Sequence, residues 1–219
     1  MSLLLLGGGE GSRMGGNKLF LSQDGAPLLA QLIGRLAPLF ADIFLAVAAG
    51  EKEKILTAMP GLNTEYRVTL CEDRMPGRGP LEGLRNALAA MNTEWGFLYA
   101  CDMPAPQEAV IRHQWSAVPH DSDVSCMRID NHILALHAFY RKTCLPHIER
   151  ALDAAEGQKR RGARIVSFYD QVRVQVLEER EISHLPGYKK SFENYNTPEE
   201  LRMSLLNAEL GGIDLGGTA

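Results

Sequence analysis

Short apolar runs alternate with amphipathic stretches along the first half of the chain. The runs are of the length and composition typical of buried strands and cover Leu3–Leu6, Asp42–Ala48, Tyr66–Cys71 and Trp95–Ala100. Between them, apolar side chains recur at helical spacing in Pro27–Ala37, Glu51–Ala58 and Leu81–Met91. Strands that alternate with helices favour right-handed crossovers and a mostly parallel sheet with helices on both faces. The pattern therefore predicts an α/β fold.

The second half of the chain is less regular. It predicts helices over Gln107–Ser116 and Lys142–Glu156 and strands over Asp123–Arg128, Ile133–Tyr140, Ile165–Phe168 and Val172–Leu177. The turn residues Asp130 and Asn131 indicate a hairpin or a bulged pair between the first two of these strands. Thr197 followed by Pro198 and two glutamates is typical of a helix start, which predicts a last helix over Pro198–Asn207. A glycine-rich flexible tail, 208–219, follows.

Length and charge limit the classes of protein that fit. At roughly 150 residues per domain, 219 residues favour one domain, which we place at 1–207. The 23 basic and 27 acidic residues give a net charge of −4, which argues against a nucleic-acid binder. The first apolar run has only four residues, too few for a signal peptide or a membrane span, so we expect a soluble cytoplasmic protein. No cysteine or histidine spacing indicates a zinc site or a disulfide framework.

A glycine-rich loop after the first apolar run is the strongest candidate for an anion site. The segment Gly7–Lys18 would bring backbone N–H groups close to a phosphate, while Arg13 and Lys18 add local positive charge. It fits neither of two common glycine motifs. Ser12 and Met14 stand where the dinucleotide-binding pattern needs glycine, and Asn17 stands where a P-loop needs lysine. A Rossmann dehydrogenase and a P-loop ATPase are therefore excluded.

Two carboxylates follow later apolar runs. Asp73 comes after the third run and Asp102 after the fourth, and Pro80 begins the helix between them. Ligands of open α/β sheets bind at the carboxyl edge, where all of these positions are expected. Asp102 suits a hard cation such as Mg²⁺, which would bridge phosphate oxygens. Taken one at a time, Asp102 could instead cap a helix and Asp73 could be a turn residue.

Four ordered motifs resemble those of one enzyme family. The loop from Leu6 to Lys18 is similar to the L-A-G-G-x-S-x-R-M-G-x-D-K signature of molybdopterin-type nucleotidyltransferases, among which the molybdenum cofactor guanylyltransferases are the closest match. Residues 79–84 (GPLEGL), 101–104 (CDMP) and 194–201 (NYNTPEEL) resemble that family's G-P-L-x-G-L, C-D-x-P and N-x-N-T-P-E-E-L. The resemblance runs from residue 3 to about 205. It implies a three-layer α/β/α sandwich of glycosyltransferase-A type.

The resemblance implies a reaction and a set of site residues. The reaction is transfer of GMP from GTP to molybdopterin, in a Mg²⁺-dependent step that releases pyrophosphate. Arg13 and Lys18 would bind the triphosphate, Asp73 the nucleoside, and Asp102 both nucleotide and metal. Asn194 and Asn196 would lie near the molybdopterin phosphate or the metal. Further nucleotide contacts would come from Leu6, Gly7, Gly8, Gly9, Gly79, Pro80 and Leu81. Transient contacts with other molybdenum-cofactor proteins would also fit this role.

Four positions depart from the family pattern. Gly7 replaces alanine, Gly11 a small hydroxyl residue and Asn17 an acidic residue, while Ala46 stands where some members have asparagine. Related cytidylyltransferases carry a similar first loop, but with A-A-G in place of the double glycine and without G-P-L-x-G-L. The motifs therefore favour GTP. Transfer of a cytidylyl or other nucleotidyl group, and a non-catalytic nucleotide-binding accessory protein, remain the alternatives.

Overall fold

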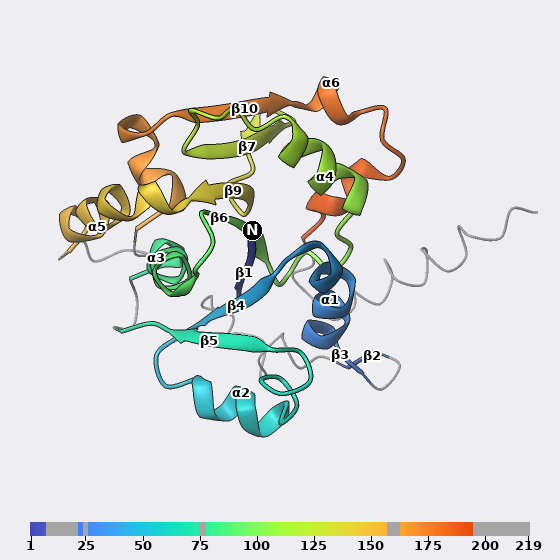
Figure 1. Ribbon diagram of the computed structural model, residues 1–219, viewed down its shortest axis with the longest axis vertical. Coiled ribbons are helices and arrows are strands. Elements are labelled where there is room, and N and C mark those ends of the chain that lie inside the picture. Colours follow the sequence, from blue (N-terminus) through green and yellow to red (C-terminus); the bar gives the residue numbers. More distant parts are fainter. Residues whose placement is uncertain (8–21, 24–25, 75–77, 157–162, 195–219) are drawn as a thin grey trace, which may run out of the picture.

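An eight-stranded sheet forms the centre of the molecule (Figure 1). The computed structural model describes residues 1–7, 22–23, 26–74, 78–156 and 163–194. The strand order is β10-β7-β9-β6-β1-β4-β5, with β8 paired to β7. Strand bounds are β1 Ser2–Leu6, β4 Asp42–Val47, β5 Val68–Glu72, β6 Trp95–Ala100, β7 Val124–Ile129, β8 His132–Ile133, β9 His137–Arg141 and β10 Val174–Glu178. A separate two-stranded ribbon joins β2 Ser22–Gln23 to β3 Ala26–Pro27.

Most neighbouring strands of the main sheet run parallel. Strand β1 pairs in parallel with β4 on one side and with β6 on the other, and β4 pairs in parallel with β5. Strand β9 runs antiparallel to both of its neighbours, β6 and β7. The chain thus builds the sheet outward from β1 to β5, then returns to add β6 on the opposite side of β1. This return confirms the predicted α/β fold and creates a topological switch point beside β1.

Helices cover both faces of the sheet and make a three-layer sandwich (Figure 1). On one face, α3 (Pro80–Ala90), α5 (Leu145–Ala154) and the 3-10 helix η5 (Ile165–Gln171) enclose one apolar core. On the other face, α1 (Leu28–Leu36), α2 (Lys52–Ala58) and α4 (Glu108–Ser116) enclose a second. Side chains of β1 alternate between these cores, Leu3 and Leu5 to one and Leu4 and Leu6 to the other. Burial on both faces explains the continuous apolar run of this strand.

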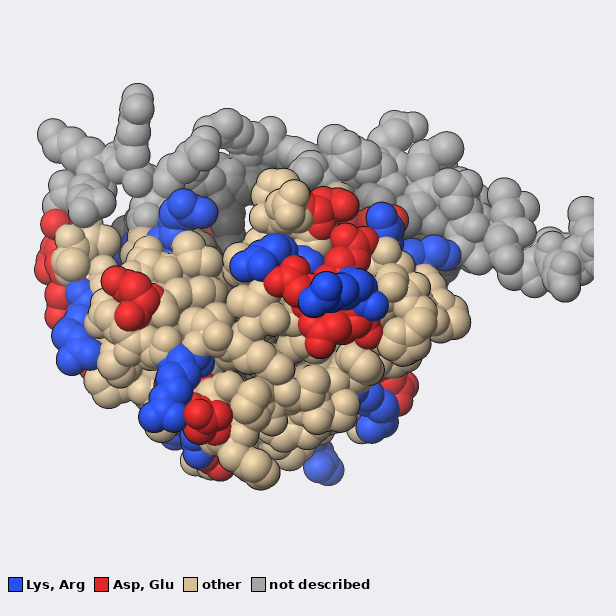
Figure 2. Space-filling view, turned by 90° about the horizontal axis from the view of Figure 1, so that it is seen from above, with Lys and Arg blue, Asp and Glu red and all other residues tan. Residues whose placement is uncertain are grey.

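Four short helical elements remain, two of them near the C-terminal end of the described chain. They are η3 Ala37–Leu39, η4 Lys142–Cys144, α6 Glu179–Ile182 and η6 Tyr188–Phe192. Seen from above, acidic and basic side chains interleave over β10 and α6 (Figure 2). Ion pairs between Arg128 and Glu178 and between Lys189 and Glu179 account for part of this pattern. On this face of the described structure, opposite charges alternate instead of forming a one-signed field.

Two predicted strands differ from the structure. Ile165–Phe168 lies in the 3-10 helix η5, not in a strand, because its two buried side chains, Ile165 and Phe168, are three residues apart. A run this short cannot by its pattern distinguish the two conformations. The predicted strand Ile133–Tyr140 is divided into β8 and β9, which have different partners. The predicted last helix, 198–207, and the tail, 208–219, lie outside the described residues.

The hairpin turn itself is confirmed. Asp130 and Asn131 both have positive φ angles, 47° and 65°. Ile129 and His132 form an antiparallel pair on either side of them. Two consecutive residues with positive φ match the twist of antiparallel strands, and aspartate and asparagine tolerate this conformation better than most residues. The sequence signal for this turn therefore had a direct local cause.

Candidate active site

The carboxyl ends of four strands meet at the switch point and carry the described candidate residues. Gly7 follows β1, and its N–H donates to the Ala46 carbonyl on β4 at 2.9 Å. Asp73 follows β5, and its N–H donates to the Val47 carbonyl at 2.9 Å. At the end of β6, the N–H of Cys101 donates to the Leu6 carbonyl at 3.2 Å. These bonds extend the parallel pairing past the strand ends, so the backbone that carries Gly7, Asp73 and Asp102 is held as part of the sheet.

Helix α3 begins at the same edge and supplies a second set of contacts. Gly79 precedes it with φ 81° and ψ −177°, a conformation that L side chains rarely adopt, and Pro80 opens its first turn. Leu81 is fully buried in the core between α3 and the sheet, and Leu6 packs in the same core. The side chains of both residues therefore hold the helix against the sheet, which leaves only their main chain for the predicted nucleotide contacts.

Gly83 explains why this helix lies so close to the sheet. A Cβ at this position would lie 2.9 Å from Cδ2 of Leu6 and 3.2 Å from Cβ of Ala46. The absence of a side chain lets α3 approach β1 and β4 closely. Ala46 is itself buried beneath the helix, with 2% of its surface exposed. The alanine at this departure from the family pattern is therefore part of the helix–sheet contact.

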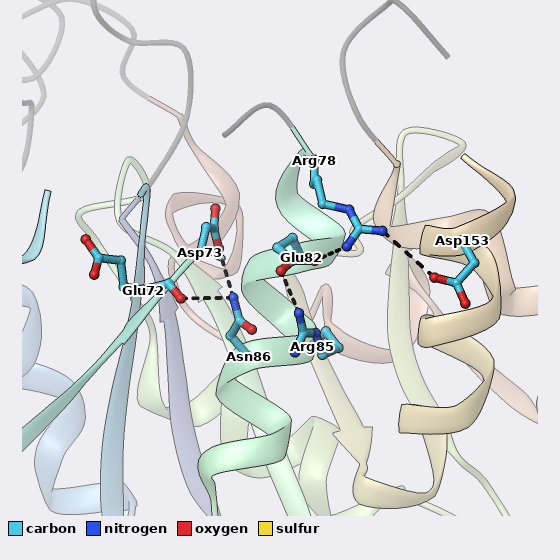
Figure 3. Close-up of polar contacts among 7 residues, drawn as sticks. All are labelled: Glu72, Asp73, Arg78, Glu82, Arg85, Asn86 and Asp153. Carbon is cyan, nitrogen blue, oxygen red and sulfur yellow. Dashed lines mark hydrogen bonds and ion pairs between the residues drawn. The ribbon is translucent and has the colours of Figure 1, made fainter. Parts of the chain in front are cut away.

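An asparagine on α3 holds the carboxylate of Asp73. The Asn86 side-chain Nδ2 donates to Oδ1 of Asp73 at 3.1 Å and lies 3.4 Å from the Glu72 carbonyl oxygen (Figure 3). Glu72 points to the other side of the strand, where its Oε1 accepts a bond from the Gly50 N–H at 2.7 Å. Asp73 is thus fixed from two directions, by the strand pairing of its own N–H and by a side chain on the facing helix.

The surroundings of Asp73 disfavour its charged form. Partial burial raises the pKa of Asp73 from 3.8 to about 6, and the negative charges of Glu82 and Glu72 contribute in the same direction. The hydrogen bond from Asn86 and the positive charge of Arg85 lower the pKa and offset part of the effect. Asp73 is consequently mostly ionised at neutral pH and becomes mostly protonated in mildly acidic solution, below about pH 6.

A buried ion pair lies in the first two turns of α3. Glu82 is fully buried, and its Oε1 accepts a hydrogen bond from Nη2 of Arg85 at 2.6 Å. Its other oxygen faces Nη1 of Arg78 at 3.6 Å, and Arg78 also lies 4.0 Å from the exposed Asp153 on α5 (Figure 3). Breaking such a buried pair by removing one partner is costly, because the other charge stays buried. The cluster therefore fixes the first turns of α3 beside Asp73.

Asp102 lies partly buried at the end of β6. Burial raises the pKa of the neighbouring Cys101 thiol, and the negative charge of Asp102 raises it further. Within the part of the chain that the structure describes, no three His, Cys, Asp or Glu side chains are grouped as a metal site. One carboxylate nevertheless fits Mg²⁺, which proteins commonly hold through one or two carboxylates while substrate phosphates and water complete its shell. The described residues thus suit a metal that arrives with a nucleotide.

Other predicted residues are not brought into this site by any described contact. Asn194 is exposed at the end of the described C-terminal segment. Three residues before it, Ser191 accepts hydrogen bonds from the Tyr99 hydroxyl and the Gln107 N–H, both at 3.1 Å. This segment is therefore attached close to the Asp102 loop. The predicted residues Gly8, Gly9, Gly11, Arg13, Asn17, Lys18 and Asn196 lie outside the described residues.

Asn86 was missed in the sequence. Nothing in its own neighbourhood separates it from other polar residues on an amphipathic helix. Its spacing of four from Glu82 places both on one face of α3, and α3 begins at the carboxyl edge of the sheet. An acidic strand end followed by a helix with two polar side chains on its inner face was the available signal.

The fold and the candidate site together define a protein of the doubly wound α/β class, with its candidate residues at the sheet edge where such folds bind ligands. Comparisons with known proteins narrow this class: residues 3–172 match the family described as MobA-like NTP transferase domain, and the chain belongs to that family. It is accordingly a nucleotidyltransferase. None of the helices among the described residues is long and apolar enough to cross a membrane.

Relatives with full-length similarity carry a more specific name. A probable molybdenum cofactor guanylyltransferase of Peptoclostridium acidaminophilum is 31% identical over 207 residues, which cover 92% of this chain and 86% of the relative. Another from Carboxydothermus hydrogenoformans is 28% identical over 200 residues, or 91% and 92% of the two chains. The crystal structure of molybdopterin-guanine dinucleotide biosynthesis protein A from Archaeoglobus fulgidus has a TM-score of 0.71 at 20% identity, covering 96% of this chain and 100% of that one. The last comparison supports the fold alone.

Proposed function

We propose that this protein transfers GMP from GTP to molybdopterin and releases pyrophosphate. The observation that carries the proposal is the meeting of Gly7, Asp73, Asp102 and the start of α3 at one sheet edge, in a chain whose full-length relatives are named molybdenum cofactor guanylyltransferases. That edge, beside a topological switch point, is where open α/β sheets bind nucleotides. A cytoplasmic location stays a prediction, supported by four buried free thiols.

The proposed step is attack by the terminal phosphate of the pterin on the α-phosphorus of GTP. A bond forms between a phosphate oxygen and that phosphorus as the bond to the leaving pyrophosphate breaks. A phosphate monoester has a second pKa of about 6, so it is already largely dianionic at neutral pH and needs no strong general base. The protein's contribution is therefore positioning and the neutralisation of charge.

The residues divide this work by their chemistry. Asp102 would hold Mg²⁺, which when bound supplies positive charge to the phosphate oxygens. Arg13, with its planar fork, would clamp phosphate oxygens, and Lys18 would act as a compact charge on the β- and γ-phosphates. Asp73 would bind the nucleoside from its position beside α3, and Asn194 and Asn196 would lie near the molybdopterin phosphate or the metal. The main chain of Leu6–Gly9 and of Gly79–Leu81 would line the nucleotide.

A thermal-shift panel tests base choice first. The protein is heated with Mg²⁺ and with GTP, CTP, ATP or UTP, each in large excess over its dissociation constant. Ligand at 100 times that constant adds about 2.7 kcal/mol of native-state stability. We expect a Mg²⁺-dependent shift that is largest with GTP. A shift selective for CTP would overturn guanylyl transfer, and the absence of a shift with every nucleotide would overturn nucleotide transfer as such.

Replacing Asp102 tests the catalytic assignment. Asp102→Ala should lower guanylyl transfer to molybdopterin by a hundredfold or more, since removal of one such electrostatic contact costs about 10²–10³ in rate. Asp121→Ala is the matched control, because Asp121 is an exposed carboxylate paired with Arg173. The measurement is Mg²⁺-dependent pyrophosphate release. Near-normal release by Asp102→Ala would remove Asp102 from the site.

A further inference from the structure

Asn86 is placed to control the direction in which the Asp73 carboxylate points. Its amide nitrogen lies 3.1 Å from Oδ1 of Asp73 and 3.4 Å from the carbonyl oxygen of Glu72. Both acceptors belong to the end of β5, whereas the donor belongs to α3. One oxygen of the carboxylate is therefore hydrogen-bonded to a helix. This bond restricts rotation of the carboxylate about the side-chain bonds of Asp73.

The backbone on both sides of the Asn86–Asp73 contact is held in place by other interactions. On the strand side, the Asp73 N–H is bonded to the Val47 carbonyl at 2.9 Å. On the helix side, Gly83 packs against Leu6 and Ala46, so α3 has no room to move closer. The buried pair of Glu82 and Arg85 fixes the same helical turn. A hydrogen bond between a fixed strand end and a fixed helix positions a functional group more precisely than a loop would.

Charge around Asp73 makes the asparagine amide important for ionisation. The negative groups that face Asp73 are Glu72 on its own strand and Glu82 on α3, and the positive group is Arg85 on α3. Burial, and to a smaller extent the two glutamates, raise the pKa of Asp73 to about 6, a net value that already includes the lowering by the Asn86 hydrogen bond and by Arg85. Without that bond, the pKa would lie nearer to neutrality and more of the carboxyl would be protonated during function.

Recognition of guanine by a carboxylate requires that the carboxylate is ionised and correctly oriented. The edge of guanine that pairs with cytosine presents two adjacent donors, N1–H and the 2-amino group, whereas adenine and cytosine each present a donor next to an acceptor. An ionised carboxylate offers only acceptors, so its two oxygens match guanine and mismatch the others. A protonated or rotated carboxyl loses this match, and sites that leave a polar group unpaired discriminate strongly.

We propose that Asn86 is a positioning residue that holds Asp73 ionised and aimed at the two donors of guanine, and so sets the preference for this base. The inference rests on the proposed function, because it requires GTP as substrate. Asn86 itself does not contact the nucleotide in this account. Its effect is carried entirely by Asp73.

The test compares GTP with ITP, which keeps N1–H but lacks the 2-amino group. Binding of each is measured by calorimetry between pH 5.5 and 8 for the unaltered protein, Asn86→Leu and Asn86→Asp. Asn63→Leu, at an exposed turn position, is the matched control. A hydrogen bond to a charged group is worth about 1.5–3 kcal/mol, so the unaltered protein should prefer GTP over ITP by about tenfold or more.

We expect both Asn86 variants to lose most of this preference at neutral pH. In the unaltered protein and in Asn63→Leu, the affinity for GTP should fall as the pH drops through about 6. In Asn86→Leu the fall should begin at a higher pH, and Asn86→Asp, which adds a negative charge, should be affected most. Thermal unfolding of each variant without nucleotide reports whether it is folded.

Two results would overturn the inference. Equal weakening of GTP and ITP, with an unchanged pH profile, would reduce Asn86 to a structural role. Binding of dGTP to the unaltered protein is measured in the same way, and an affinity that drops for dGTP but not for ITP would place Asp73 on the ribose 2′-hydroxyl instead of the base. Failure of the unaltered protein to bind GTP at all is a separate result, which would overturn the proposed function and with it this inference.

Discussion

Gly83 shows at the scale of one residue how the sequence sets the distance between a helix and a sheet. Leu6 and Ala46 pack against the position where a side chain would begin. A Cβ added there would lie 2.9 Å from Cδ2 of Leu6 and 3.2 Å from Cβ of Ala46. Ala46 cannot rotate away, so an added methyl group must push α3 outward. The same displacement would move Asn86 away from Asp73.

Gly83→Ala should therefore destabilise the protein and weaken GTP binding. Overpacking costs about 1–3 kcal/mol, while replacing glycine within a helix gains about 1 kcal/mol, so the net expected loss is about 1 kcal/mol. Gly34→Ala in α1 is the control, because no atom lies within 4 Å of its added Cβ, and it should stabilise by about 0.5–1 kcal/mol. Urea unfolding measures both. If Gly83→Ala and Gly34→Ala stabilised the protein equally, α3 could move away from the sheet at no cost in free energy.

Asp73 is a residue whose proposed role in nucleotide binding opposes the stability of the fold. Its pKa is about 6 in the folded protein against 3.8 ordinarily, so the folded state holds the proton more tightly. Ionisation thus lowers the free energy of unfolding as the pH rises from about 4 to about 6, and the loss is complete above that window. Asparagine, a neutral side chain of the same shape, would not lower the free energy of unfolding in this way.

Asp73→Asn should accordingly be as stable as the unaltered protein near pH 4 and more stable at pH 7. The gain should be on the order of 1 kcal/mol, since solvent screens a partly buried group. Denaturation at the two pH values measures it, with Asp121→Asn as an exposed control. A difference that does not change with pH would contradict the assignment. GTP binding should be lost together with the gain.

These residues mark how far the sequence could predict the site. Asp73 and Asp102 were predicted because each lies within two residues of the end of a strand, and strand ends of a parallel sheet share one edge. Asn86 was not, because its contact with Asp73 depends on the distance between α3 and β5, which only the packing around Gly83 determines. Residue type and spacing along the chain carry no information on that distance.

At the scale of elements, a buried hydrogen-bond network attaches the C-terminal segment to the sheet. Nε2 of Gln114 donates to the Ser125 carbonyl at 2.8 Å, so Oε1 of Gln114 faces Nδ1 of His137, 3.2 Å away, and accepts a hydrogen bond from the Nδ1–H. Nε2 of His137 is then an acceptor for the Ser191 hydroxyl at 3.1 Å. That hydroxyl oxygen accepts the Gln107 N–H. Every proton has one consistent place, and His137 is neutral.

Acid should disrupt this network. Burial lowers the pKa of His137 from 6.5 to about 3, so the unfolded chain binds a proton more readily than the folded one between these values. The network's contribution to stability is therefore complete above pH 6.5 and is lost as the pH falls towards 3. His137→Phe keeps an aromatic ring among its aromatic neighbours but cannot be protonated.

We expect His137→Phe to be less stable than the unaltered protein at pH 7, by about 1–3 kcal/mol, because buried polar partners lose their bonds. The gap should narrow as the pH is lowered to 4. Urea unfolding of both proteins at the two pH values measures the gap, and the contribution of Asp73 cancels in the comparison. A gap of constant size would show that His137 does not titrate with unfolding.

Element types followed from the sequence where burial imposed a clear period. The continuous apolar run of β1 and the paired turn residues Asp130 and Asn131 each had one interpretation. The region Ile165–Phe168 did not, because an apolar residue at each end of a short segment fits a strand and a 3-10 turn equally well. The division of Ile133–Tyr140 arises because its two halves pair with different strands, which is a tertiary effect.

At the scale of the whole molecule, the reversed strand β9 sets the site apart from the C-terminal third. The parallel group β5-β4-β1-β6, together with the start of α3, supplies every described candidate nucleotide contact, and β9 separates this group from β7 and β10. The two parts are nonetheless one sheet, and Ser191 returns from beyond β10 to contact Tyr99 on β6. The nucleotide half is therefore completed by a segment that comes last along the described chain.

This late contact has a consequence for how the protein is made. Ser191 is translated 92 residues after Tyr99, which at about 5–20 residues per second is a delay on the order of 5–20 s. During that interval the emerging chain has β6 and, later, His137, but lacks the hydroxyl and carbonyl that satisfy them. In a nascent or prematurely terminated chain, the Tyr99 hydroxyl and Nε2 of His137 therefore stay without the partners that Ser191 gives them in the finished protein.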